Sequence, residues 1–191
     1  MRNTTAAVIV IGNEILSGKV VDTNAAFLVQ ELRPLGVDLQ RVLVIPDEVD
    51  VIAQAIREYH PAFDVVFTSG GVGPTHDDVT MEGIAAGLDR TVIQHPVLVE
   101  KLREFFGDDL NAARRKMTEV PDGAEPLYAD SRTFPIITVE NIYILPGIPE
   151  IFREKFLAIK SRFAADPYVL RVVYLMGMEL SLIHISEPTR L

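Results

Sequence analysis

Several residue types and patterns are missing from this chain of 191 residues, and each absence excludes a class of site. There is no cysteine, so disulfide bonds and thiolate metal sites are excluded. No apolar run approaches the length that spans a membrane. The apolar run at residues 6–11 is also too short for the core of a secretory signal. We therefore expect a cytoplasmic protein that makes no membrane contact.

Positive charge is also scarce in this chain. Lysine and arginine together number 18 against 27 aspartates and glutamates, which gives a formal net charge of −9. A nucleic-acid-binding protein depends on lysine and arginine to neutralise phosphates, so this balance argues against nucleic acid as a partner. A small phosphorylated molecule remains compatible with it, because backbone dipoles or a divalent cation can offset the negative field locally.

The most informative stretch that is present is the glycine-rich segment TSGGVGPTHDDVTME at residues 68–82. It follows a short apolar run that predicts a buried strand, and it precedes a segment that can begin a helix. Glycines between a strand and a helix allow a tight bend and a close approach of the backbone to a ligand. The positive end of the helix then favours a phosphate or pyrophosphate group. The spacing matches neither the dinucleotide fingerprint nor the Walker loop.

Strand and helix patterns alternate along the chain. Apolar runs predict buried strands at residues 6–11 and 65–68, and further strands are predicted at 37–45, 134–139 and 141–145. Helices are predicted at residues 24–35, 49–59, 97–106, 112–117 and 150–163, with Gly36 ending the first and Thr80 capping another that begins near it. This alternation predicts an α/β fold, a three-layer α/β/α arrangement with a mainly parallel sheet. Ligands of such folds bind beyond the carboxyl ends of the strands.

The glycine-rich segment closely resembles the signature of the molybdopterin-binding (MoaB/Mog) family. Its Pro-Thr-His-Asp-Asp variant is similar to the CinA N-terminal domain and to the molybdopterin-binding-like domain of eukaryotic FAD synthases. Further loops agree: GNEILSG and Asp22-Thr23-Asn24 resemble the first loop of the family, Ile45-Pro46-Asp47-Glu48 the second, and Leu145-Pro146-Gly147 a late loop. The resemblance implies a MoaB/Mog-like fold and a ligand site at these loops.

The resemblance also assigns expected roles to residues. Asp78, Asp47 and Glu14 are the candidate catalytic residues, and Asp78, Asp47 and Asp77 the candidate metal ligands. The candidate ligand-binding residues lie on the same loops: Gly70, Gly71, Gly73, Thr75, Asn24, Thr80 and Gly147. Lys19 and Arg132 are possible phosphate partners.

Each of these acids also has a plainer interpretation. Asp78 could be a turn or capping acid. Asp47 could cap the helix that follows it. Asp77 and Glu14 could simply be solvated.

This set of acids suits Mg²⁺, Mn²⁺ or Co²⁺, because hard cations prefer oxygen ligands. We expect a metal-dependent nucleotide pyrophosphatase that acts on ADP-ribose or FAD, as the resemblance implies. Two alternatives remain open, a non-catalytic pterin- or nucleotide-binding module and molybdopterin adenylyl transfer in molybdenum cofactor biosynthesis. In each case the partner is a phosphorylated small molecule, a nucleotide or a pterin, and we also expect a homo-oligomer.

We expect the MoaB/Mog-like domain to occupy residues 1–165 and a truncated C-terminal subdomain to begin at residues 166–179, with a strand at 168–175. Residues 180–191 match nothing in the family and resemble the translation of a sequencing adapter. We therefore expect them to be a non-native tail.

Overall fold

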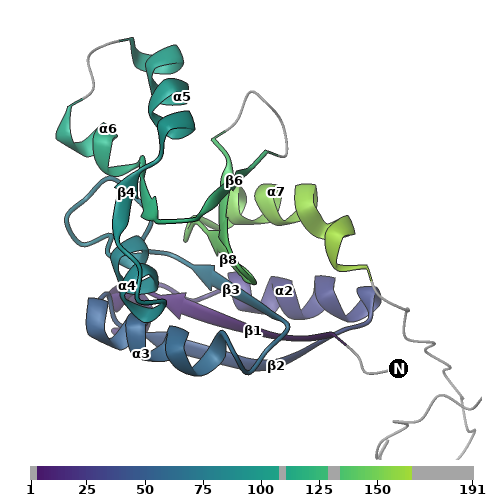
Figure 1. Ribbon diagram of the computed structural model, residues 1–191. Coiled ribbons are helices and arrows are strands. Elements are labelled where there is room, and N and C mark those ends of the chain that lie inside the picture. The colour runs from purple at the N-terminus through teal and green to yellow at the C-terminus, as the bar shows by residue number, and fades with distance from the viewer. Residues whose placement is uncertain (1–3, 108–110, 129–133, 165–191) are drawn as a thin grey trace, which may run out of the picture.

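A six-stranded sheet forms the centre of the structure, a computed structural model that describes residues 4–107, 111–128 and 134–164 (Figure 1). The strand order is β2-β1-β3-β8-β7-β6. The bounds are β1 (Thr4–Ile11), β2 (Val37–Ile45), β3 (Val65–Ser69), β6 (Glu125–Leu127), β7 (Ile136–Val139) and β8 (Ile142–Leu145). β2, β1, β3 and β8 run parallel, whereas β7 and β6 are antiparallel to their neighbours. The predicted mainly parallel sheet is confirmed.

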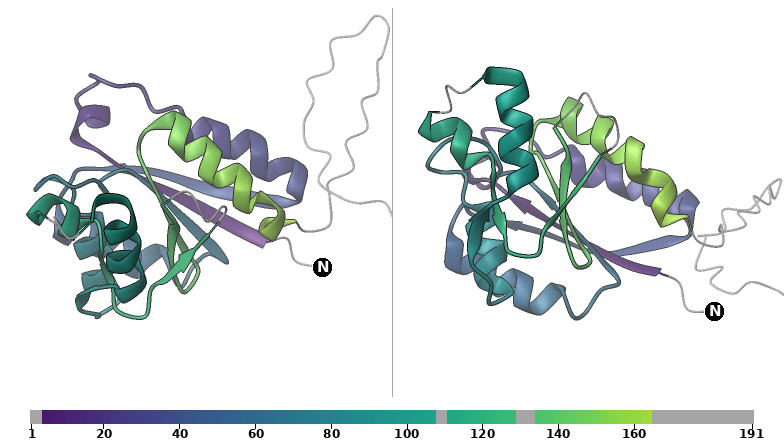
Figure 2. Two further views of the ribbon diagram at one scale, coloured as in Figure 1. Left: turned by 90° about the horizontal axis from the view of Figure 1, so that it is seen from above. Right: turned by 45° about the horizontal axis from the view of Figure 1, so that its top comes forward.

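Helices cover both faces of this sheet, as Figures 1 and 2 show. One face packs against α2 (Asn24–Leu32) and α7 (Pro149–Ile159), and the other against α3 (Val49–Tyr59) and α4 (Thr80–Gly87). The two apolar cores lie on opposite sides of the sheet, so the predicted three-layer α/β/α arrangement is also confirmed.

The sequence of β1 explains why this strand lies inside the sheet, between β2 and β3. Side chains of a strand alternate between the two faces of the sheet. Ala6, Val8 and Val10 contribute to the core under α2 and α7, while the intervening Ala7, Ile9 and Ile11 contribute to the core under α3 and α4. A strand buried on both faces needs an unbroken apolar run, and residues 6–11 supply it.

The helix expected at residues 24–35 ends earlier as an α-helix than its apolar pattern suggests. α2 stops at Leu32, and a 3₁₀ turn, η1 (Arg33–Leu35), follows it. Pro34 lies in that turn, and its ring cannot continue an α-helical hydrogen-bond ladder. Gly36 then ends the turn with a positive φ of 77°, in agreement with the predicted cap.

A second, smaller sheet pairs β4 (Val92–Gln94) with β5 (Glu119–Pro121) in antiparallel fashion. Between these strands the chain forms α5 (Pro96–Phe106) and α6 (Ala112–Lys116), which extend beyond β4, away from α3, in Figure 1. Both helices match the prediction closely, but neither short strand was expected. This hairpin-like segment matters for function because it brings α6 to the glycine-rich loop.

α1 (Asn13–Leu16) follows β1 directly, and η2 (Lys160–Phe163) closes the last described helix. Within the described parts of the chain, no helix is long and apolar enough to cross a membrane. The expected subdomain at residues 166–179, its strand at 168–175, the tail at 180–191 and Arg132 all lie outside the described residues.

Candidate functional site

The four loops that resemble family motifs leave the sheet at one edge. They follow β1, β2, β3 and β8, which are the four mutually parallel strands. The loop backbones are also joined directly, because Gly12 N–H donates to the Ile45 carbonyl over 3.1 Å and Gly70 N–H donates to the Leu145 carbonyl over 3.2 Å. The four loops therefore meet at the carboxyl ends of the strands, where ligands of such folds bind.

The turn after β3 requires glycine at two consecutive positions. Gly70 has φ +105° and Gly71 has φ +64°, values that other residues rarely adopt. A Cβ atom on Gly70 would lie 2.2 Å from the Ile11 carbonyl oxygen, and one on Gly71 would lie 2.3 Å from Thr80 Oγ1. Both conformation and space exclude a side chain here, so the two glycines let β1, β3 and α4 meet closely.

Thr80 fastens this turn and does not cap its own helix, so the predicted capping role is wrong. Val79 occupies the N-cap position of α4, and no side chain caps the helix. The Thr80 hydroxyl instead donates to the Gly70 carbonyl over 2.9 Å, and its N–H donates to the Gly71 carbonyl over 3.1 Å. Thr80 is fully buried, and it fixes both glycines in place.

Asp78 folds back onto the loop that carries it. Its Oδ2 accepts hydrogen bonds from the Thr75 N–H, over 2.9 Å, and from the Thr75 hydroxyl. Partial burial favours the neutral carboxyl, but the bonds from Thr75 and from the Gly73 N–H, together with nearby Lys116, outweigh it and lower the pKa of Asp78. The ionised form of Asp78 is therefore favoured, and the side chain orders the turn, as its plainer interpretation predicts.

The surroundings of Asp47 shift its pKa in the opposite direction to that of Asp78. Its Oδ2 accepts a 2.8 Å hydrogen bond from the Asn13 N–H, which ties the second loop to the first. Partial burial raises the pKa of Asp47 despite that bond, and the charges of Glu14, Asp78 and Asp77 raise it further. The N-cap of α3 is Glu48, without a side-chain capping bond, so Asp47 does not cap the helix.

The remaining two acids lie at the margin of the site. Asp77 is exposed and pairs with the exposed His76 at 3.0 Å. Glu14 is exposed, and its carboxylate lies so close to Gly12 that a Cβ there would be 2.7 Å from Oε1. In the described ranges no three histidine or acidic side chains are placed to hold a metal ion together. The three predicted ligands Asp47, Asp77 and Asp78 thus do not form a closed cage.

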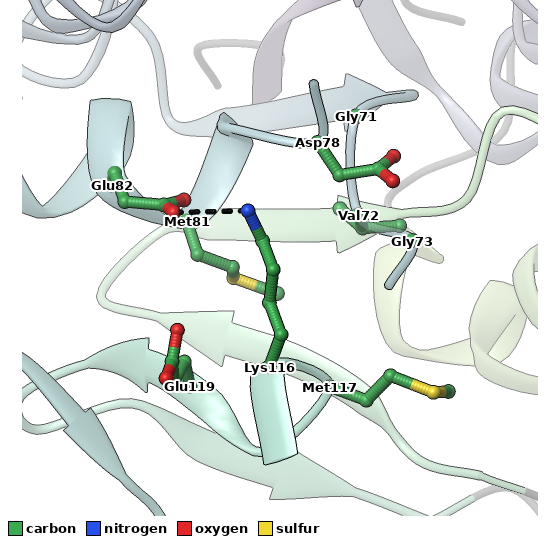
Figure 3. Close-up of a pocket in the computed structure, with 9 residues that line it drawn as sticks. All are labelled: Gly71, Val72, Gly73, Asp78, Met81, Glu82, Lys116, Met117 and Glu119. Carbon is green, nitrogen blue, oxygen red and sulfur yellow. Dashed lines mark ion pairs between the residues drawn. The ribbon is translucent and has the colours of Figure 1, made fainter. Parts of the chain in front are cut away.

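Two clefts flank the glycine turn. The first, of about 270 Å³, lies between the turn, α4 and the segment around α6 (Figure 3). It is lined by Gly71, Val72, Gly73, Asp78, Met81, Glu82, Lys116, Met117 and Glu119. Lys116 reaches from α6 to Glu82, and their charged groups lie 3.3 Å apart.

The second cleft, of about 350 Å³, lies between the first loop, α2 and the late loop. Its lining includes Asn24, Ser69, Gly147 and Glu14. Asn24 is only 3% exposed, and its Nδ2 donates to Ser69 Oγ over 2.9 Å and to the Gly147 carbonyl over 2.8 Å. Its Oδ1 is buried and has no hydrogen-bond partner among the described residues. Asp22 supports this position by accepting from the N–H groups of Asn24 and Ala25.

The sequence interpretation missed the basic side chain of the first cleft. It named Lys19, which is exposed on the first loop, and Arg132, which lies outside the described residues. Lys116 ends the run Arg114-Arg115-Lys116, a basic cluster in an acidic chain. That run was the available signal, but only the docking of α6 shows which of its members faces the glycine turn.

Comparisons with known proteins agree with this geometry. Residues 7–165 match the family described as "Probable molybdopterin binding domain". A protein of Archaeoglobus fulgidus is 36% identical over 176 residues, which cover 92% of this chain and 76% of that protein. A probable FAD synthase of Caenorhabditis elegans is 34% identical over 174 residues, which cover 80% of this chain but 34% of that protein.

Among solved structures, the protein CinA of Thermoplasma acidophilum, a protein of unknown function, superposes with a TM-score of 0.76 at 32% identity. The match covers 85% of this chain and 100% of that one. The chain spans 59% to 62% of the length of three further relatives.

Proposed function

Because the chain belongs to the molybdopterin-binding domain family, we propose that its glycine turn binds the phosphates of a nucleotide or pterin and that the domain hydrolyses the pyrophosphate bond of ADP-ribose or FAD. One observation carries the proposal. The Gly70–Gly71 turn, Asp47 and Asp78 meet at the carboxyl edge of four parallel strands, where such folds bind ligands.

The acids at this edge fit a divalent cation that is held partly by the ligand. Mg²⁺ commonly takes one or two carboxylates, several waters and substrate phosphates, so it needs no three-residue cage. Asp47 and Asp78 are close enough for the charge of one to raise the pKa of the other, which is the arrangement that a shared cation would relieve. Such a cation, when bound, offsets pyrophosphate charge and activates a water for attack.

The protein groups then have separate tasks. Asp78, ionised and fixed by Thr75, presents a constant negative charge beside the turn. Asp47, tied to the first loop by the Asn13 N–H, supplies the second carboxylate for the cation. Glu14 adds a further negative charge that acts on Asp47. The glycine turn holds the phosphate oxygens in position.

The second cleft suits the heterocyclic part of the ligand. Its polar groups are neutral apart from Glu14 and Asp22 at its margin, and the Asn24 Oδ1 accepts no hydrogen bond from the described residues. A buried acceptor without a partner is unfavourable by about 1–3 kcal/mol, and a small rotation of the Asn24 amide towards the cleft would let a ligand N–H or hydroxyl recover it. An adenine amino group, a pterin amide or a ribose hydroxyl can each supply that donor.

A screen of ligands combined with a turnover assay tests this function. ADP-ribose, FAD, ATP and molybdopterin are compared by thermal shift with and without Mg²⁺, Mn²⁺ or Co²⁺, and hydrolysis of ADP-ribose and FAD is followed by chromatography. Stabilisation together with metal-dependent release of AMP is expected. Binding without turnover in any metal would leave a non-catalytic module, which the engagement of Asp78 by its own loop also suits. A protein that none of these ligands stabilises would contradict the whole proposal.

A further inference from the structure

The carboxylates that line the first cleft are unfavourable for an anionic ligand. Asp78, Glu82 and Glu119 all line it, and the chain as a whole is acidic. A phosphate group entering this cleft would be repelled by these carboxylates unless a positive charge lay among them. Among the described residues that line either cleft, Lys116 is the only lysine or arginine.

Lys116 is positioned between the acids of two different elements. It is the last residue of α6, and its side chain is 21% exposed and directed into the cleft (Figure 3). Its ammonium group lies 3.3 Å from Glu82 Oε1 on α4, and its charge also acts on Asp78 of the glycine-rich loop. The ammonium therefore lies within electrostatic reach of the loop that is proposed to hold phosphate.

The ion pair with Glu82 is not well optimised. Charge-assisted N–H···O bonds between ionised groups are usually about 2.7–2.9 Å long, shorter than the 3.3 Å found here. Glu82 Oε2 is buried and has no hydrogen-bond partner among the described residues. A lysine ammonium has three donors, so Lys116 can keep Glu82 as one partner and offer the other donors to a ligand.

We propose that Lys116 contacts the ligand's phosphate groups at the glycine turn and that Glu82 holds its ammonium in position for that contact. This inference rests on the proposed phosphate binding at Gly70 and Gly71, and it adds a residue from a separate part of the chain. The ligand class that such a site recognises is an anion that carries a pyrophosphate, because the ammonium is attracted by the charge of the phosphate groups. A single point charge gives no preference for the ring that is attached to them.

Two variants of Lys116 and one of Glu82 test the assignment in the full-length protein. Inorganic pyrophosphate, ADP-ribose and adenosine are titrated without metal, by calorimetry or ³¹P NMR. Lys116→Gln should weaken pyrophosphate and ADP-ribose binding roughly tenfold, the scale of a lost charge-assisted hydrogen bond, and should leave adenosine binding unchanged. Lys116→Arg should restore most of the affinity. Glu82→Gln should weaken pyrophosphate binding roughly threefold, because the carboxylate that holds the Lys116 ammonium towards the turn is lost.

A matched control uses the ion pair of Lys160 and Glu31, whose charged groups lie 2.6 Å apart. α2 and α7 both begin beside the site, and this pair lies near their far ends, so Lys160→Gln removes the same charge away from the clefts. It should leave pyrophosphate affinity unchanged. Thermal unfolding of each variant separates a folding defect from a binding defect.

The outcomes separate this inference from the proposed function. Equal pyrophosphate affinity in wild type and Lys116→Gln would overturn the inference, as would an equal loss of adenosine binding or wild-type protein that does not bind pyrophosphate. Pyrophosphate binding that depends on Lys116 would support it even if neither ADP-ribose nor FAD bound. That result would defeat only the proposed substrate.

Discussion

The two clefts beside the glycine turn are lined by different kinds of polar group. The first contains three carboxylates and a lysine, and its walls come from the turn, α4 and the segment between the two strands of the small sheet. The second is built around a buried amide, a serine hydroxyl and a backbone carbonyl that are linked by hydrogen bonds. The first cleft is therefore suited to handle charge, and the second to recognise shape and hydrogen-bonding pattern.

This difference shows how an acidic protein can hold an anionic ligand. The large sheet fixes the turn through backbone contacts, and the charged groups are added from separate elements. The turn that holds the ligand and the charged groups that act on it are therefore contributed by different residues. A substitution should be able to remove a charged group and leave the turn in place.

The largest expected effect comes from Asp78 in the charged cleft. Asp78→Asn keeps the size of the side chain but removes its charge, so hydrolysis of ADP-ribose should fall about a hundredfold or more. Asp47→Asn should have a similar effect if both carboxylates hold one cation. The double variant should then lose much less than the product of the two effects. Steady-state turnover with metal varied measures this, and multiplicative losses would contradict a shared cation.

The glycine turn borders the first cleft, and its substitution should disturb the packing of the turn against β1 as well as the binding of phosphate. Gly70→Ala forces a Cβ into the Ile11 carbonyl and strains a backbone with φ +105°. We expect a loss of about 2 kcal/mol or more in the free energy of unfolding, together with loss of pyrophosphate binding. Gly18→Ala is the control, because Gly18 has φ +72° but no atom near the added Cβ. A Gly70→Ala variant as stable as Gly18→Ala would contradict the close packing, and urea unfolding measures both.

Substitution of Asn24 should have the opposite ligand selectivity to substitution of Lys116. Asn24→Ala should weaken adenosine binding about tenfold, because the donor from the ligand loses its acceptor, while pyrophosphate affinity should stay within about twofold. Calorimetry of both ligands on one preparation tests this opposite selectivity. If Asn24→Ala and Lys116→Gln weakened the same ligands, the two clefts would not be functionally separate. Thermal unfolding shows whether loss of the bonds to Ser69 and Gly147 alters the fold.

The smallest effects should be those of pH on stability, and they should have opposite signs at the two aspartates. The folded-state pKa of Asp78 lies below its ordinary value of 3.8, so its stabilising contribution is present above about pH 3.8 and is lost as pH falls through the folded value. Asp78→Asn should therefore destabilise the protein at pH 7 and approach wild type in strong acid.

For Asp47 the folded-state pKa is raised above 3.8, so the ionised form is disfavoured by folding. Its unfavourable contribution is present at neutral pH and disappears as pH falls from the raised value towards 3.8. Asp47→Asn should leave stability at pH 7 unchanged or a few tenths of a kcal/mol higher, with no advantage below about pH 4. Chemical unfolding across pH 3–8 measures both variants. Parallel pH profiles for the two would contradict the different environments.

Much of the fold could be predicted because its strong patterns are local. The strand at 37–45 and the helix at 49–59 have the bounds that the apolar pattern indicates. β4, β5 and β6 contain three residues each, and β5 and β6 include a proline. Such short strands form because residues distant in the sequence pair with them. Three residues are too few to show the apolar alternation that predicts a strand.

The site was predictable to the extent that its residues follow parallel strands. Asp47 lies on the second loop and contacts the first, Asn24 begins α2 beside the late loop, and Gly70 and Gly71 lie in the turn that needs them. Thr80 was misread because a threonine at the start of a helix usually caps it, whereas this one bonds to a carbonyl ten residues earlier. Lys116 was missed because α6 docks beside α4 only through the tertiary fold.

The small sheet shares no strand with the large one, and this has a consequence for how the scaffold can diversify. One wall of the first cleft is the glycine-rich loop and α4, which are packed against the large sheet. Its opposite wall belongs to the connection between β4 and β5, where buried Leu98, Leu102 and Thr118 must be kept but the exposed positions accept a new sequence. A descendant of this chain could therefore acquire a preference for another anion through exposed positions of this connection, while it inherits the glycine turn unchanged.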